Sequence, residues 1–145
     1  MSVDRAQDAG KRYQRSQPQP DAVVGLPPEL LAELGASALS VEECRAALVR
    51  LGYCTAGHPA VTLELYGGLR LKTGWDLLPL HANTVGEAVE ILRRIHPKAA
   101  RLLPAPVEIE KHFRFAINGS AVTGEVSHRL RDGDHIVLFS ASVGG

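Results

Sequence analysis

The sequence predicts an α+β domain whose mixed β-sheet is crossed by one main helix, with a helical extension before it. Three stretches predict this class: residues 61–66 alternate between apolar and polar, residues 85–95 carry apolar residues at helical spacing, and residues 135–139 are almost wholly apolar. They indicate a half-buried strand, an amphipathic helix and a strand covered on much of both faces. Hydrophobic residues make up 45% of the 145 residues, so the chain can bury a core.

The chain begins with a segment that shows no apolar periodicity. Residues 1–24 are mostly polar and contain two prolines, Pro18 and Pro20, which is typical of a disordered tail. Residues 25–58 are predicted to be a helical extension. Within it, Pro27-Pro28 indicates the start of a short helix over residues 29–34, and Gly35 would end it.

A second helix of the extension has a clear start signal. Ser40-Val41-Glu42-Glu43 matches a capping box, and Gly52 marks the end of the helix. Its apolar positions lie on one face at helical spacing: Cys44, Ala47, Leu48 and Leu51. So short a segment cannot bury that face alone, so we expect it to dock on the rest of the chain or on a partner.

The predicted domain over residues 60–145 opens with a hairpin. Residues 61–65 form its first strand, and residues 75–80 form its second. The glycine-containing stretches at residues 67–68 and 72–74 are predicted to be turns between the two strands.

The main helix follows the hairpin. Thr84-Val85-Gly86-Glu87 matches another capping box, and Pro97 closes the helix. The helix carries an apolar stripe of Val85, Ala88, Val89, Leu92 and Ile95. Residues 98–103 are predicted to form a further turn.

The last strands set the topology. Residues 113–117 alternate as a third strand that ends at Asn118-Gly119, and the tight turn at residues 131–134 precedes the final strand over residues 135–139. A short extra element lies between these two strands. An apolar final strand belongs in the middle of a sheet. With the first strand as its parallel neighbour, the order of elements predicts a ubiquitin-like β-grasp fold.

Composition excludes several classes of function. Lysine plus arginine and aspartate plus glutamate number 16 each, and this balance argues against a nucleic-acid partner. No apolar run approaches the roughly 20 residues that span a bilayer. Residues 1–20 lack the apolar region of a signal peptide, and two cysteines suit a reducing compartment. We therefore expect a cytoplasmic protein without membrane contact.

Several motifs occur together in the order found in one known family. They are the run at residues 61–70, Thr84-Val85-Gly86-Glu87, Ala116-Ile117-Asn118-Gly119, Leu130-Arg131-Asp132-Gly133-Asp134 and the final Gly144-Gly145. Together they resemble the MoaD/ThiS sulfur-carrier proteins. The resemblance leaves residues 1–60 uncovered.

The resemblance implies a carrier rather than an enzyme, with no catalytic residue and no bound cofactor. In this family a ubiquitin-activating-type enzyme uses ATP to adenylate the C-terminal carboxylate, and sulfur from a persulfide converts it to a thiocarboxylate. The tail then donates the sulfur to a partner such as the large subunit of molybdopterin synthase. Carried over, the acyl carbon is that of Gly145, and Gly144 stands behind it. The expected pathway is molybdenum cofactor biosynthesis, although a thiamine or cysteine carrier would look almost the same.

A physical argument for the role of the tail also holds without the family resemblance. Its carbonyl must enter another protein's buried site, so the chain behind it must be thin and free to adopt positive φ, as glycine is. Ser140-Ala141-Ser142 gives a stalk of small residues. Family tails usually carry a proline pair and one residue between valine and the diglycine. Here serines stand for the prolines and Val143 abuts Gly144, so the usual docking register and activating partner do not carry over directly.

The final strand offers a second candidate site. If Ile136 and Leu138 face the helix, Val137 and Phe139 form an apolar patch on the other face, and such a patch marks a protein contact. The alternative is that the helix over residues 41–51 covers it. We also assign Val143 and Arg131 to partner binding, with a solvated charge as the alternative for Arg131.

Other groupings of reactive residues are weaker. Cys44, Cys54 and His58 match no common zinc spacing, so no metal site is expected, and nothing near Cys54 predicts a lowered thiol pKa. Scattered histidines near strand ends, His135 among them, are expected to be solvated. The alternatives to a sulfur carrier are a ubiquitin-like protein modifier joined to lysines and a phage tail-assembly protein of the same fold. An independent enzyme would need converging titratable groups, which the sequence does not show.

Overall fold

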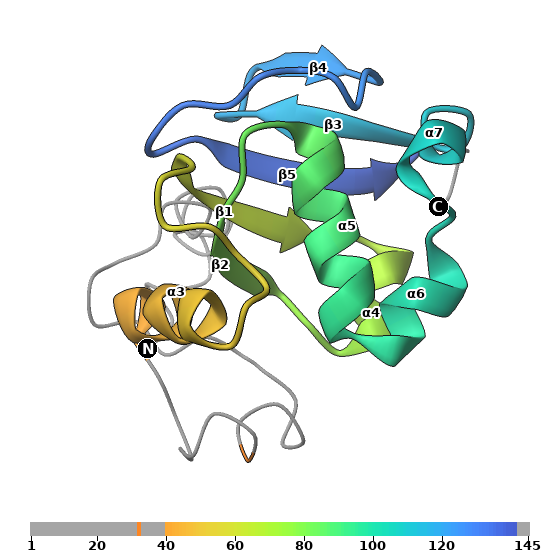
Figure 1. Ribbon diagram of the computed structural model, residues 1–145. Helices are drawn as coiled ribbons and strands as arrows, with labels where there is room; N and C mark the ends of the chain where they lie inside the picture. The colour runs from red at the N-terminus through yellow and green to blue at the C-terminus, as the bar shows by residue number, and fades with distance from the viewer. Residues whose placement is uncertain (1–31, 33–39, 142–145) are drawn as a thin grey trace, which may run out of the picture.

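The structure is a computed structural model that describes residue 32 and residues 40–141 (Figure 1). The predicted tail at residues 1–24 lies outside the described residues, as does the short helix predicted over residues 29–34 apart from Ala32. The described elements therefore begin with helix α3.

A single five-stranded sheet organises the domain. Its strands are β1 (Ala60–Leu65), β2 (Leu77–His81), β3 (Phe113–Ile117), β4 (Ala121–Thr123) and β5 (His135–Ser140). They lie in the order β2-β1-β5-β3-β4, with β1 and β5 parallel and the other pairs antiparallel. The last long strand is thus central, and the predicted β-grasp fold is confirmed. β4 is the short element expected between the third strand and the last.

Helix α5 (Val85–Ile95) crosses one face of the sheet (Figure 1). Thr84 caps it, since its Oγ1 accepts a hydrogen bond from Glu87 N at 3.1 Å. The Glu87 carboxylate accepts from Asn83 N at 2.6 Å rather than from Thr84 N, so the predicted capping box is shifted by one residue. The core between helix and sheet contains side chains with 0% exposure: Val85, Ala88, Val89, Leu92, Leu63, Leu80, Phe115, Ile136 and Leu138.

The predicted hairpin turn is wrong, because a helix connects its strands. α4 (Gly68–Thr73) runs between Gly67 and Gly74, whose φ angles are 65° and 78°. The two glycine stretches therefore bracket a helix instead of forming a turn. Leu69 and Thr73 lie four residues apart on its buried side, and their burial holds a helix too short to be stable alone.

Two more short helices follow α5. α6 (Pro97–Leu102) confirms the turn expected there, whereas α7 (Pro106–Ile109) was not predicted. Each begins with proline, which suits the first helical position. His96 joins α6 to α4, because its Nδ1 accepts from Lys98 N at 3.2 Å and its Nε2 lies 3.1 Å from Thr73 O. These contacts fix α4 and α6 against each other at one end of the sheet.

Helix α3 (Val41–Arg50) packs against β2, the outer strand of the sheet (Figure 1). Its capping box is present: Ser40 Oγ accepts from Glu43 N at 3.1 Å, and Glu43 Oε1 accepts from Ser40 N at 2.9 Å. Cys44 and Leu48 are fully buried. The apolar face of this helix thus docks on the chain's own domain.

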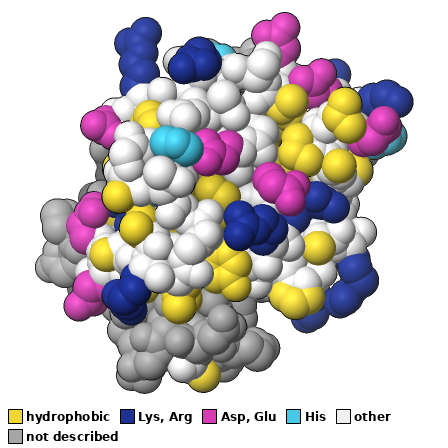
Figure 2. All heavy atoms as spheres, viewed as in Figure 1, with side chains coloured by type: hydrophobic (Ala, Val, Ile, Leu, Met, Phe, Trp, Pro, Cys, Tyr) yellow, Lys and Arg dark blue, Asp and Glu magenta, His cyan; other side chains and the backbone are white. Residues whose placement is uncertain are grey.

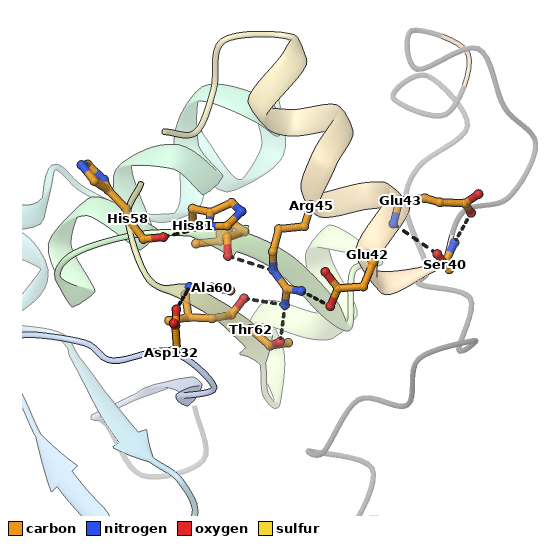
Figure 3. Close-up of polar contacts among 11 residues, drawn as sticks. Ser40, Glu42, Glu43, Arg45, His58, Ala60, Thr62, His81 and Asp132 are labelled. Carbon is orange, nitrogen blue, oxygen red and sulfur yellow. Dashed lines mark hydrogen bonds and ion pairs between the residues drawn. The ribbon is translucent and has the colours of Figure 1, made fainter. Parts of the chain in front are cut away.

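Arg45 anchors α3 to the sheet (Figure 3). Its Nε donates to Leu80 O at 3.1 Å, and its Nη2 donates to Val61 O at 3.1 Å and to Thr62 Oγ1 at 3.3 Å. Nη1 forms an ion pair with Glu42. A guanidinium buried to 7% exposure is satisfied here only because two strands and its own helix supply acceptors together.

Candidate functional site: the outer sheet face and the tail

Strand β5 presents different residues to the two faces of the sheet. Ile136 and Leu138 are fully buried under α5, while Val137 and Phe139 are only partly buried on the opposite face. This is the alternation that the sequence predicts. It leaves two apolar side chains of the central strand at the surface.

The neighbours of Val137 and Phe139 extend this apolar surface. Val137 is paired with Ala116 and Phe139 with Arg114 of β3. Tyr66, which follows β1, donates its backbone N–H to Leu138 O at 3.1 Å, and its side chain is 56% exposed. Because residues alternate along a strand, Tyr66 shares a face with Phe139. We call this set, Tyr66, Arg114, Ala116, Val137 and Phe139, the outer sheet face.

Helix α3 packs on β2, and its Arg45 reaches β1 through Val61 O and Thr62 Oγ1. In the sheet, β1 lies between β2 and β5. Whether the helix over residues 41–51 or a partner covers Val137 and Phe139 stays a prediction.

A buried polar pair lies on the same side of the sheet. His135 Nε2 is 2.8 Å from Glu64 Oε1, and the two side chains are 8% and 12% exposed. Asn118 fixes the backbone of His135: its Oδ1 accepts from His135 N and its N–H donates to His135 O, both at 2.8 Å. The expectation that His135 is solvated is wrong, because the parallel pairing of β1 with β5 brings a carboxylate onto it.

Arg131 lies far from the start of the tail. It belongs to the turn before β5, where its N–H donates to Asp134 Oδ2 at 2.9 Å, and its side chain is exposed. The tail follows Ser140 at the other end of the strand. Six residues of β-strand span roughly 20 Å. The structure therefore does not bring Arg131 together with the tail, and its partner-binding role stays a prediction.

The central strand leads directly into the tail. Ala141, the last described residue, donates its N–H to His112 O at 2.8 Å, which ties the end of β5 to the start of β3. Val143, Gly144 and Gly145 lie outside the described residues. Their roles as partner contact and acyl carrier remain predictions.

The two thiols are poorly placed for chemistry. Both cysteines are buried, and burial raises the pKa of Cys44 to about 12 and also raises the pKa of Cys54. A thiol is nucleophilic only as the thiolate, so neither is activated in the folded chain. Within residues 40–141 no three His, Cys, Asp or Glu side chains gather into a candidate metal site, and no described helix is long and apolar enough to cross a bilayer.

Comparisons with known proteins agree with this architecture. The family model described as the ThiS family matches residues 63–145. The solution structure of small archaeal modifier protein 1 from Methanosarcina acetivorans is 22% identical, covers 61% of this chain and 100% of its own, and has a TM-score of 0.51. A search of curated proteins found no significant match.

Two further structures show weaker likeness. SAMP1 from Haloferax volcanii is 24% identical over 59% of this chain and 99% of its own, with a TM-score of 0.48. A chain of the BexX/CysO complex from Amycolatopsis orientalis is 22% identical over 59% of this chain and 100% of its own, with a TM-score of 0.49. At such identities, structural likeness speaks for the fold and not for the activity.

Proposed function

Because this chain belongs to the ThiS family of ubiquitin-like sulfur carriers, we propose that its Gly145 carboxylate is the group that is activated and loaded with sulfur. A ubiquitin-activating-type enzyme joins this carboxylate to AMP from ATP and releases pyrophosphate. A persulfide sulfur then displaces AMP to give an acyl disulfide, and a thiol reduces that disulfide to the thiocarboxylate. The chain is the co-substrate in these steps, and its partners supply the catalytic groups.

The observation that carries this proposal is the family match, which extends through residue 145 on a fold whose central strand leads into the tail. Beyond Ala141, four residues span at most about 14 Å when extended. That length reaches into a partner's active centre while β5 stays in the sheet. Gly144 and Gly145 have no side chains to obstruct a narrow channel.

The outer sheet face is the proposed binding surface for the partner. Val137 and Phe139 are partly exposed apolar residues on the strand that carries the tail, and Tyr66 lies beside them. A partner that binds this face places the tail at a fixed distance from its own catalytic groups. Val143 would enter the contact with the tail, and Arg131 would meet a partner that extends along the whole of β5.

We assign the sulfur to molybdopterin synthesis, with the large subunit of molybdopterin synthase as acceptor in the cytoplasm. This assignment rests on the sequence motifs that resemble the MoaD/ThiS sulfur-carrier proteins. A test in the source organism is deletion of the gene followed by assay of a molybdenum enzyme. Loss of that activity, restored by the wild-type chain, is the expected result. If the deletion strain instead requires added thiamine or cysteine, the carrier acts in the synthesis of that compound.

The carrier itself is tested by intact-mass spectrometry of the chain purified from its source organism. We expect a fraction in which sulfur replaces one carboxylate oxygen, located at Gly145 by fragmentation. Deleting Gly145 should abolish that fraction, whereas Ser142→Ala, a matched change in the stalk, should retain it. An isopeptide bond from Gly145 to a lysine would instead identify a protein modifier. A plain acid in every sample would rule out both activated forms.

A further inference from the structure

Two helices at one end of the molecule carry basic residues and no acidic ones. α4 and α6 carry Arg70, Lys72, Lys98 and Arg101 and no aspartate or glutamate. Three of these residues, Lys72, Lys98 and Arg101, are exposed. In Figure 2 dark-blue side chains lie along the lower right edge, where Figure 1 shows α4 and α6, and no magenta side chain lies along that edge. We call Arg70, Lys72, Lys98 and Arg101 the basic end.

Three cations outside the basic end form ion pairs with carboxylates. Arg45 pairs with Glu42, Arg93 with Glu90 and Lys111 with Glu108, each three residues apart along the chain. Within the described part of the chain, the cations of α4 and α6 form no such ion pair. An uncompensated cluster produces a positive potential that attracts an acidic surface.

An exposed apolar side chain accompanies these cations. Leu71, between Arg70 and Lys72 in the sequence of α4, is 85% exposed, although Leu69 and Thr73 of the same helix are buried. The backbone that presents it is fixed, because Thr73 Oγ1 donates to Leu69 O at 2.7 Å and Thr73 O lies 3.1 Å from His96 Nε2. A rigidly held apolar residue beside cations combines the apolar and polar contacts that protein interfaces use.

The basic end lies where the tail begins. α4 contacts β5, and β5 runs toward the end of the sheet at which α4, α6 and α7 gather (Figure 1). A protein that takes up the tail therefore approaches this end of the molecule. The basic end is thus continuous with the surface through which the proposed function works.

We propose that the basic end is a second docking surface, which binds an acidic patch with an apolar recess on the ATP-dependent enzyme that activates the tail. This inference rests on the proposed function. An acidic protein fits better than a nucleic acid, which offers Leu71 no apolar recess. It also fits better than an anionic membrane, which binds broader apolar faces than one leucine. Contacts at the basic end and at the outer sheet face would together fix the direction of the tail.

The test measures ATP–pyrophosphate exchange by the purified activating enzyme of the source organism, with the full chain as the varied substrate. The variant Lys98→Glu/Arg101→Glu is compared with Arg50→Glu/Arg129→Glu, which changes the charge equally at exposed positions elsewhere. We expect the first to raise KM about tenfold at low salt with kcat unchanged, and the second to change KM less than about twofold. The wild-type KM should rise with salt, and that of the first variant should not.

Leu71→Ser tests the apolar part separately. It should raise KM about fivefold and leave the salt dependence intact, since it removes no charge. Thermal unfolding of each variant checks that the fold is retained. If wild-type chain is activated but both basic-end variants keep its KM, the docking inference fails and the proposed function stands.

Two other outcomes would contradict the docking inference. If the wild-type chain supports no exchange, both the proposed function and the docking inference fail. Binding of the wild-type chain to phosphatidylglycerol vesicles or duplex DNA, lost in Lys98→Glu/Arg101→Glu while KM is unchanged, would overturn the assignment to an acidic protein.

Discussion

The two faces of the sheet differ in what covers them. Under α5, Leu63, Ile136 and Leu138 are 0% exposed, whereas on the outer face Val137 and Phe139 remain partly exposed and Tyr66 is 56% exposed. Strand β5 supplies residues to both faces by simple alternation. Neighbouring residues of one strand therefore have separate roles in the proposed function: the buried ones stabilise the fold, and the others are the proposed partner contact. Substitutions along β5 can separate the two.

The largest effect on stability is expected at the buried face. Leu138→Ala should lower the free energy of unfolding by about 3 kcal/mol, because it leaves a cavity between α5 and the sheet. Val137→Ala, the neighbouring control, should cost less than about 1 kcal/mol. Urea unfolding followed by the fluorescence of Trp75, the single tryptophan, measures both. Equal losses would mean that the outer face is part of the core.

The contact between α3 and the edge strand β2 should contribute to stability, as the buried face does. Arg45→Ala removes a buried guanidinium with its three hydrogen bonds to the sheet and its ion pair with Glu42, and should cost about 2 kcal/mol. Arg50→Ala, at an exposed position of the same helix, should stay within about 0.5 kcal/mol of wild type. The urea midpoints of the two variants measure both losses of stability. A similarly small loss in both would show that α3 is not anchored through Arg45.

Unfolding at alkaline pH tests the packing of α3, which carries the buried Cys44, at the same edge of the sheet. The Cys44 thiol keeps its proton in the folded chain up to a pKa of about 12, while in the unfolded chain it titrates near 9.0. The stability due to the buried thiol is therefore full below pH 9 and is lost as pH rises toward 12, at up to roughly 1.4 kcal/mol per pH unit.

Cys44→Ala should remove that part of the pH dependence. Urea unfolding of both chains at about pH 8 and about pH 10 gives the two slopes. An unchanged slope in the variant would show that Cys44 ionises without hindrance in the folded state.

On the outer sheet face, a small effect on stability should accompany a large effect on partner binding. Phe139→Ser on the outer sheet face should cost about 1 kcal/mol or less, since the ring is partly exposed already. The same change should raise the KM for activation by the adenylating enzyme about tenfold. If the Phe139→Ser variant keeps the wild-type KM, the outer sheet face does not contact the adenylating enzyme.

Much of the fold followed from local signals. The alternation at residues 61–65 and 113–117 and the capping boxes at Ser40 and Thr84 predicted β1, β3, α3 and α5. The apolar last strand predicted its own central place in the sheet. α4 was missed because glycines signal both turns and helix ends, and burial of Leu69 decides between them only after the chain has folded.

The candidate site was predictable only in part. The alternation of β5 identified Val137 and Phe139 as a surface pair, because period-two patterns reveal faces. The pairing of His135 with Glu64 joins residues far apart in the chain, so no local pattern reports it. The basic end was missed for the same reason, since α4 and α6 come together only in the folded chain, where His96 Nε2 lies 3.1 Å from Thr73 O.

By itself, the sequence determined most of the strands and the longer helices, which side of each is apolar, and two final glycines without side chains. These properties follow from spacing along the chain and from the side chains themselves. The tertiary structure alone decided that α3 binds the β2 edge through Arg45, that β5 buries one face fully and the other only in part, and that cations from two helices share one end. Such features depend on distances between residues remote in sequence, which are fixed only when the sheet forms and the helices pack on it.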